Sequence, residues 1–165
     1  MLVGEQFALL GAQLLLRRRR SDWPTPLAVR VVGDVAMMTG VVVAAGGAAG
    51  LGVGLTVSPL PNANAQLRSG GMYRWVRHPI YSGLLLASAG WTVNSGDRRH
   101  ILLWAGLVAL LRYKAGYEEN VLRATFTGYG QYSQITPRFV PSPSMLGRSI
   151  SARCGSERDA GVVCN

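Results

Sequence analysis

Two groups of ionisable residues stand next to apolar stretches of the chain, where charge is costly. Arg77, His78 and Tyr81 lie at the beginning of one apolar run, and Glu118 and Glu119 follow a later one. Ionisable side chains at membrane depth are expensive to bury, and they are usually paired or functional. A cation, an imidazole, a phenol and two carboxylates form a set that could hold a charged ligand at a lipid boundary.

The sequence between the two groups predicts a helical hairpin. Apolar runs at Ile80–Val93 and Ile101–Leu111 are separated by a short polar turn, Asn94–His100. Pro79 favours a helix start, because its missing N–H would be unpaired in the first turn anyway. An antiparallel hairpin returns the chain to the side on which it began, so we expect both ionisable groups on one face of the membrane.

A purely structural interpretation of these residues competes with the functional one. Arg74 and Arg77 could anchor the chain at the membrane surface, and Trp75 and Tyr81 could belong to an aromatic belt. The two glutamates would then form a solvated helix face. His78 favours the functional interpretation, because a His-Pro pair between a loop and a span has no anchoring role.

The composition is typical of a small membrane protein. The chain has 165 residues, of which 48% are hydrophobic and only 15% are charged, whereas soluble domains average about 25% charged residues. Many of the 21 glycines fall inside apolar runs, where small residues allow helices to pack closely. We therefore expect an all-α, small polytopic membrane protein with three to four transmembrane helices, a C-terminal helical hairpin and a polar cap.

Two further apolar segments precede the hairpin. Leu2–Leu16 is shorter than the roughly 20 residues that a span requires, and it ends in the basic run Arg17–Arg20. Val35–Val57 carries no charge and is long enough to cross. If it crosses, the basic run lies outside, against the positive-inside rule. Either the first segment is incomplete or one of the two does not span.

Two local patterns in this region predict packing. Gly46, Gly50 and Gly54 recur every four residues, which places them on one helix face suited to a neighbouring helix. The pattern lacks the preceding strand and the following lysine of a nucleotide-binding loop. Arg30 and Asp34 are one helical turn apart, and we expect them to pair.

After the hairpin the chain continues as a helix and then changes character. Apolar residues recur at helical intervals up to Phe126, so we expect one long helix that leaves the membrane. An irregular cap follows at Thr127–Ser144. The Ser-, Gly- and Arg-rich tail from Met145 has no core-forming pattern, and we expect it to be disordered.

Charge and cysteine content argue against two other classes of protein. The net charge is +9, but Lys and Arg fall in short clusters beside apolar segments rather than in one basic face. This distribution argues against a nucleic-acid partner. Cys154 and Cys164 lie in the tail without His or Cys at metal-ligand spacing, so no metal site is expected.

Two motifs bracket the predicted hairpin. Gly70–Leu86 reads GGMYRWVRHPIYSGLLL, and Glu118–Pro141 reads EENVLRATFTGYGQYSQITPRFVP. The first resembles the G-x-Y-x-x-x-R-H-P-x-Y-x-G signature of isoprenylcysteine carboxyl methyltransferases and their bacterial relatives. The second resembles their ending, E-E-x-x-L-x-x-x-F followed by Y-x-x-Y and R-x-x-P. The phospholipid N-methyltransferases share the same plan, and the resemblance covers about Leu55–Pro141.

The resemblance implies an integral membrane methyltransferase that uses S-adenosylmethionine without a Rossmann domain. A carboxylate suits the ribose hydroxyls, the amino group or the sulfonium of this cofactor, and His78 or Arg77 suits its carboxylate. The implied cofactor pocket has one wall formed by Arg77, His78, Tyr81 and Gly83, and a second wall formed by Glu118 and Glu119.

The resemblance also implies catalytic roles for Arg138 and Tyr132. Arg138 matches the arginine before the family's final proline, and it would orient an anionic group of the substrate. The segment Phe126–Tyr129 is one residue tighter than the common family form. For this reason Tyr129 receives no role, whereas Tyr132 keeps one.

The implied reaction is methyl transfer to a carboxylate or amine of a lipid-like or apolar substrate, with membrane lipids as partners. We expect the bacterial inner (plasma) membrane, with the active site facing the cytoplasm, where S-adenosylmethionine is found. Residues 1–57 would form N-terminal spans, 58–141 the methyltransferase core and 142–165 the tail. The alternative is a non-catalytic membrane scaffold or accessory subunit that retains the hairpin.

Overall fold

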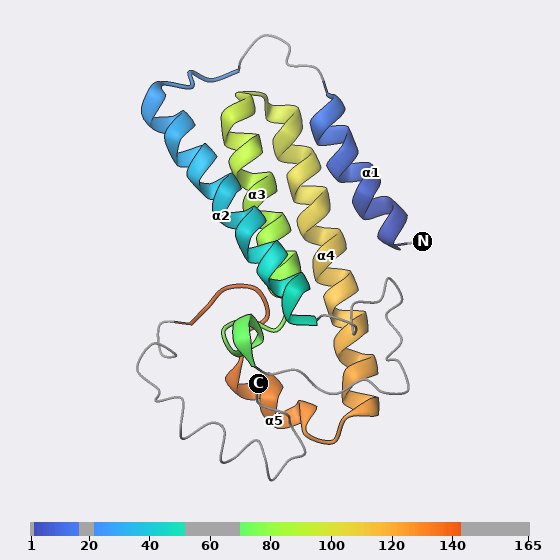
Figure 1. The fold of residues 1–165 in the computed structure, drawn as a ribbon. Coiled ribbons are helices and arrows are strands. Elements are labelled where there is room, and N and C mark those ends of the chain that lie inside the picture. The colour runs from blue at the N-terminus through green and yellow to red at the C-terminus, as the bar shows by residue number, and fades with distance from the viewer. Residues whose placement is uncertain (1, 17–21, 52–69, 143–165) are drawn as a thin grey trace. The chain divides into compact units, whose positions relative to one another are not determined.

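The computed structural model describes residues 2–16, 22–51 and 70–142, and the regular secondary structure of this part of the chain consists of helices, without strands (Figure 1). The all-α expectation is therefore confirmed for the described residues. The elements, in chain order, are α1 (Leu2–Leu15), α2 (Leu27–Leu51), the 3₁₀ helix η2 (Gly71–Arg74), α3 (Pro79–Ser95), α4 (Arg98–Thr125) and α5 (Tyr129–Ile135). Gly54 lies outside the described residues, and so does the tail that begins at Met145.

The predicted hairpin is present as α3 and α4. Pro79 is the first residue of α3, as its missing N–H led us to expect. Gly96 makes the turn with a φ of 67°, a conformation that glycine adopts without steric cost. Asp97 then caps α4, because its Oδ1 accepts a hydrogen bond of 2.9 Å from the backbone N–H of Arg99. The single long helix expected to run up to Phe126 is confirmed, since α4 ends at Thr125.

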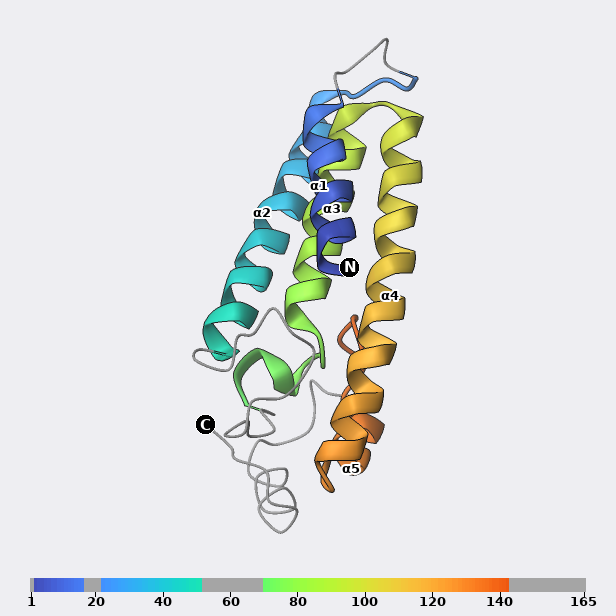
Figure 2. The ribbon, with the colours of Figure 1, turned by 90° about the vertical axis from the view of Figure 1, so that its right-hand side faces the viewer.

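The chain divides into two compact units. The first consists of Met1–Ala45 and Tyr81–Ala115, and the second of Gly46–Ile80 and Gly116–Asn165. In the first unit, α1 and the parts of α2, α3 and α4 that belong to it run side by side (Figures 1 and 2). The second unit contains the end of α2, η2, the end of α4 and α5.

Within the first unit, glycines bring the backbones of α2 and α3 into direct contact. A Cβ atom added at Gly83 would lie only 2.5 Å from the carbonyl oxygen of Gly40. Two helical turns further along α3, a Cβ at Gly90 would lie 2.7 Å from the backbone nitrogen of Met37 and would also collide with the Gly33 carbonyl. The two helices therefore pack so closely that only glycine fits at these positions.

The glycine pattern expected to form a helix-packing face does so only in part. Gly46 and Gly50 face the side chains of Met72 and Tyr73 in η2, which is not a long neighbouring helix. Gly47, between them, is the glycine that meets the first residues of α3, with Ile80 N at 3.0 Å from its added Cβ. The four-residue spacing identified a small-residue surface but not the element that covers it.

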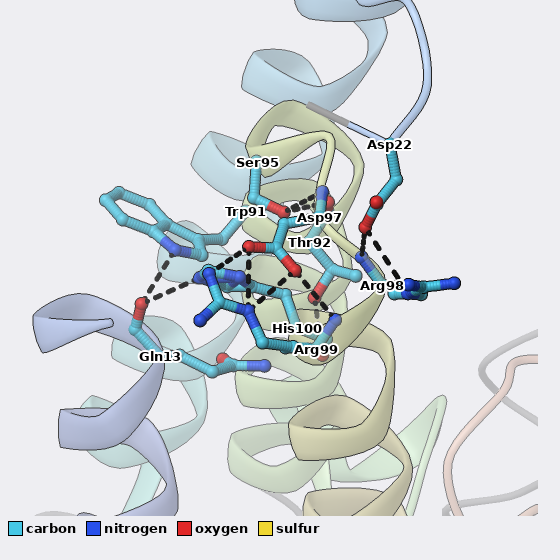
Figure 3. Close-up of polar contacts among 9 residues, drawn as sticks. All are labelled: Gln13, Asp22, Trp91, Thr92, Ser95, Asp97, Arg98, Arg99 and His100. Atoms are coloured by element: carbon cyan, nitrogen blue, oxygen red, sulfur yellow. Dashed lines mark hydrogen bonds and ion pairs between the residues drawn. The ribbon is translucent and has the colours of Figure 1, made fainter. Parts of the chain in front are cut away.

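Polar contacts at the α3–α4 turn hold α1 against the hairpin of the first unit (Figure 3). The carbonyl oxygen of Gln13 accepts hydrogen bonds from Trp91 Nε1 at 3.1 Å and His100 Nε2 at 3.2 Å. Ser88 Oγ donates to Gln13 Oε1 at 2.6 Å. Asp22, in the segment before α2, accepts from the backbone N–H of Arg98 at 2.9 Å. These contacts tie the N-terminal helix and the following connection to one turn.

Among the described helices, α2 alone is long and apolar enough throughout to cross a membrane, with a mean hydropathy of 1.8. It begins at Leu27, earlier than the expected Val35, so it includes Arg30 and Asp34. The expected pairing of these two residues is wrong. Arg30 donates to Thr25 Oγ1, and Asp34 accepts a 2.7 Å hydrogen bond from Asn94 Nδ2 of α3. A count of three to four spans stays a prediction.

Candidate functional site

Two backbone hydrogen bonds in the second unit join the segment before α3 to the segment after α5. The N–H of Arg77 donates to the carbonyl of Pro137 at 2.9 Å, and the N–H of His78 donates to the carbonyl of Arg138 at 3.1 Å. These bonds bring together residues that are far apart in the sequence. The side chains of Arg77, His78 and Arg138 thereby converge on one carboxylate of α4.

That carboxylate belongs to Glu119, whose side chain is 1% exposed. Its Oε1 accepts from His78 Nε2 at 3.1 Å and from Arg138 Nε at 2.8 Å, and its Oε2 accepts from Arg138 Nη2 at 2.7 Å. Arg77 Nη1 lies 3.5 Å from the same Oε2. Glu119 is thus held by a bidentate arginine, an imidazole and a second guanidinium, which is a strong arrangement for a buried charge.

These partners keep Glu119 ionised. Burial by itself would raise the pKa of the carboxyl. The hydrogen bonds from His78 and Arg138, together with the positive charges of Arg77 and Arg138, outweigh burial and lower the pKa of Glu119 to about 2. The carboxylate is therefore negative over the whole physiological range.

Glu118, the second carboxylate of the predicted site, is more accessible. Its side chain is 20% exposed, and its Oε2 lies 3.7 Å from His78 Nδ1, which is too long for a hydrogen bond. The two ring nitrogens of His78 thus point toward two different carboxylates, at 3.1 Å and 3.7 Å. The structure brings together the residues predicted to bind cofactor, Arg77, His78, Glu118 and Glu119. Arg138, predicted to orient an anionic group of the substrate, is instead hydrogen-bonded to Glu119 in the same cluster.

Two buried polar groups of this unit, Tyr129 and Arg77, lie beside each other. Tyr129 is 1% exposed, and its hydroxyl interacts with the Arg77 guanidinium but makes no hydrogen bond of good geometry with the described residues. Nε and Nη1 of Arg77 likewise make none, although Nη1 is within ion-pair distance of Glu119. Buried donors are normally paired, so Arg77 and Tyr129 could receive a ligand.

The surroundings keep the Tyr129 phenol neutral. Burial, reinforced by the negative charge of Glu119, outweighs the positive charge of Arg77 and raises the pKa of Tyr129 to about 12. The hydroxyl is therefore a donor and not a phenolate at neutral pH. Sequence reasoning left Tyr129 without a role. Leu122 and Phe126 pack against the cluster of Tyr129 and Tyr132, a contact made after α4 has ended and therefore not predictable from helical periodicity.

Tyr132, expected to be catalytic, is buried and already hydrogen-bonded. Its hydroxyl donates to the backbone carbonyl of Tyr73 at 2.6 Å, and the hydroxyl of Tyr73 donates to the carbonyl of Gly47 at 3.2 Å. These two bonds link α5 to η2 and η2 to the end of α2. In this structure, Tyr132 connects elements of the second unit.

The remaining predicted residues, Tyr81 and Gly83, belong to the first unit. The ring of Tyr81 lies 5.2 Å from Nζ of Lys114, and Gly83 packs against α2 as described above. Their contribution to a cofactor site stays a prediction.

The described residues thus form a helical fold with one helix, α2, long and apolar enough to cross a membrane, and with a cluster of buried charged side chains around Glu119. Residues 29–128 match the family model of phospholipid methyltransferase, and the chain belongs to this family. The match confirms the resemblance in the sequence, and it assigns methyl transfer as the chemistry of the family. It includes Arg77, His78, Glu118 and Glu119 and ends just before Tyr129. No curated protein sequence matches the chain.

Proposed function

We propose that the chain is an integral membrane methyltransferase that uses S-adenosylmethionine and methylates a carboxylate or amine of a lipid-like or apolar acceptor. The observation that carries the proposal is the buried pair Arg77 and Tyr129 beside the ionised Glu119, because Nε and Nη1 of Arg77 and the Tyr129 hydroxyl make no hydrogen bond of good geometry with the described residues. A buried cation and a neutral phenol fit the carboxylate end of the cofactor. Glu118, the more accessible carboxylate, fits its amino group or ribose hydroxyls.

In this proposal Glu119 and the residues around it have different roles. Glu119 is already occupied by Arg138 and His78, so it orients these two side chains rather than binding ligand itself. The guanidinium of Arg138 would hold Glu119 in place. The backbone carbonyl of Arg138, which accepts a hydrogen bond from the N–H of His78, would position His78. Tyr81, Gly83 and Tyr132 are retained as proposed site residues.

When bound, S-adenosylmethionine supplies a methyl group made electrophilic by its sulfonium. The protein then contributes binding, alignment and the exclusion of water, which are effects of position and electrostatics. None of the described residues needs to form a covalent intermediate for this chemistry.

We further propose that residues 58–141 form the methyltransferase core between N-terminal spans and a tail. The location would be the bacterial inner membrane, with the site on the cytoplasmic side. The family match and the apolar α2 support a membrane location. The cytoplasmic placement follows from the cytosolic source of the cofactor.

The test is direct titration of the full chain, purified in a neutral detergent, with S-adenosylmethionine and S-adenosylhomocysteine by calorimetry. Wild type should bind both. Arg77→Gln and Tyr129→Phe should each weaken affinity about tenfold, as expected for the loss of a charge-assisted or buried hydrogen bond. Arg112→Gln is the control, since it removes the same charge from an exposed position of α4.

Absence of binding by folded wild-type chain would refute the enzyme assignment and leave a non-catalytic scaffold. Equal losses in Arg77→Gln and Arg112→Gln would show that only net charge matters, and would move the site elsewhere. If binding is found, transfer of label from methyl-labelled cofactor into a lipid extract identifies the class of acceptor.

A further inference from the structure

Helices α1 and α4 of the first unit share a surface that is bounded by charge at one end. Glu5 of α1 and Arg112 of α4 are both exposed. Close to them in the sequence, Nζ of Lys114 donates to Oε1 of Gln6 at 3.3 Å. This bond brings the beginning of α1 beside the part of α4 that carries Arg112. The two exposed charges therefore mark the same end of the α1–α4 surface.

The other end of the α1–α4 surface is the turn between α3 and α4 (Figure 3). Nε of Arg99 donates to both carboxylate oxygens of Asp97 at 3.0 Å, and the side chain of Arg98 is 81% exposed. The carbonyl of Gln13, near the end of α1, accepts from His100 Nε2 at 3.2 Å. Hydrogen bonds thus hold the polar groups in place, so this boundary is fixed by the fold.

The surface between these two ends is apolar and short. Its exposed large side chains include Phe7 on α1 and Ile101 and Leu102 on α4. From Arg99 to Arg112 helix α4 rises by about 20 Å. The hydrocarbon core of a typical bilayer is about 30 Å thick. The apolar surface is therefore shorter than such a bilayer by about one third.

A short apolar surface is accommodated by side chains that reach out to the headgroups, by association with another protein, or by a thinner bilayer. Side chains of an α-helix tilt toward its N-terminus. The side chain of Arg112 therefore starts toward Arg99, away from the nearer headgroups. Helix α2, with 25 residues, is about 38 Å long and adapts to a given thickness by tilting. The α1–α4 surface consequently sets the thickness that fits the unit.

We propose that the α1–α4 surface fits a bilayer whose hydrocarbon is thinned to about 20 Å beside it. The partner is thus a membrane of short-chain lipids, with Glu5 and Arg112 at the level of the headgroups. Phe7, Ile101 and Leu102 contact the acyl chains. The inference goes beyond methyl transfer, and the only part of the proposed function on which it rests is the membrane location.

The test is the melting temperature of the full chain in lipid nanodiscs, without cofactor. The lipids are dimyristoleoyl, dioleoyl and dierucoyl phosphatidylcholine, which share a headgroup and increase in chain length in this order. Wild type should melt highest in the dimyristoleoyl lipid and should lose about 2–4 °C or more at each step to longer chains. Equal melting temperatures, or a maximum in the dierucoyl lipid, would overturn the proposal.

Two double variants test whether Glu5 and Arg112 set the length. Glu5→Leu with Arg112→Leu extends the apolar surface past both residues, so the maximum should move to the dioleoyl or dierucoyl lipid. Glu5→Gln with Arg112→Gln removes the same charges but keeps both positions polar, so the maximum should stay in the dimyristoleoyl lipid. Each variant is compared with itself across the lipids, so a general loss of stability does not affect the result. Equal shifts in both variants, or no shift in the leucine variant, would contradict the proposal.

A second copy of the chain is the competing occupant of this surface. Cross-linked dimers in the nanodiscs, with a melting temperature that does not depend on the lipid, would show a protein interface and overturn the proposal. Cofactor binding is measured separately in detergent. A chain that binds S-adenosylmethionine without a lipid preference would refute this inference alone. A chain with the lipid preference that does not bind the cofactor would refute the proposed enzyme activity alone.

Discussion

Glu119 is the acceptor shared by three basic side chains, so its removal differs from removal of any one partner. Without the carboxylate, Arg77 and Arg138 would be left close together and without a countercharge. We expect Glu119→Gln to lower the free energy of unfolding by about 3–5 kcal/mol, as for other buried pairs that lose one member. Denaturant or thermal unfolding in detergent measures the loss. Glu118→Gln, at the more exposed carboxylate, should cost much less.

The lowered pKa of Glu119 also predicts how stability depends on pH. The carboxyl ionises with an ordinary pKa of 4.5 when unfolded and about 2 when folded. Its contribution is therefore complete above pH 4.5 and is lost as the pH falls toward 2, by about 3 kcal/mol at most. Melting temperatures recorded across this window should fall in wild type. They should fall less steeply in Glu119→Gln, and parallel curves would contradict the assignment.

Tyr129 and Tyr132 form a matched pair for testing the two phenols. Tyr132→Phe removes the 2.6 Å hydrogen bond to the Tyr73 carbonyl and should lower the free energy of unfolding by about 1 kcal/mol. Tyr129→Phe removes a hydroxyl whose interaction with Arg77 falls short of good hydrogen-bond geometry, so it should cost less stability than Tyr132→Phe. The same variant should weaken cofactor binding, and a stability loss equal to that of Tyr132→Phe would contradict this division.

At the scale of elements, the α2–α3 contact depends on atoms that glycine lacks. Gly83→Ala would place a Cβ against the backbone of Gly40 and Ala44, so the helices must separate. We expect a loss of about 1–3 kcal/mol. Gly116→Ala is the control, because nothing lies within 4 Å of its added Cβ and alanine favours a helix by up to about 1 kcal/mol. Melting temperatures should move in opposite directions.

The elements that sequence can predict are those with local signals. Pro79, the polar turn and the helical periodicity up to Phe126 each act within a few residues, so they are sufficient to predict the hairpin and the long α4. The partner of a glycine is a matter of tertiary packing, which explains why the spacing of Gly46 predicts the wrong kind of neighbour. The pairing expected for Arg30 and Asp34 fails for the same reason, because Asn94 approaches from another helix.

The candidate site, like the fold, could be predicted from the sequence only in part. The spacing of the motifs is sufficient to predict that Arg77, His78, Glu118 and Glu119 lie together, because the hairpin fixes their common side. It is not sufficient to predict that Arg138 binds Glu119 or that Tyr129 lies beside Arg77, because both depend on how the cap folds back.

For the whole molecule, the proposed orientation places the C-terminal cap in the cytoplasm. Helix α4 has 28 residues, so it is about 42 Å long and exceeds the roughly 30 Å of hydrocarbon. The chain has two cysteines, Cys154 and Cys164, both near the C-terminus. In intact bacterial cells they should resist a membrane-impermeant maleimide and react after permeabilisation.

The opposite end of α4 supplies the control for this orientation. Arg98 is the first residue of α4, and its side chain is 81% exposed. Arg98→Cys, in a chain whose two native cysteines are replaced by serine, should react in intact cells. Labelling of Cys154 and Cys164 in intact cells, with Arg98→Cys protected, would invert the proposed topology.

The contact between Gly40 and Gly83 has a genetic consequence. A bulky mutation in a core is often rescued by a second mutation that shortens the facing residue. Here the facing residue is already glycine, and the atoms in the way are main-chain atoms. A selection for revertants of Gly83→Ala should therefore yield true reversion and few second-site suppressors at position 40. Neither glycine of the pair can be replaced, because the facing glycine has no side chain that a second mutation could shorten.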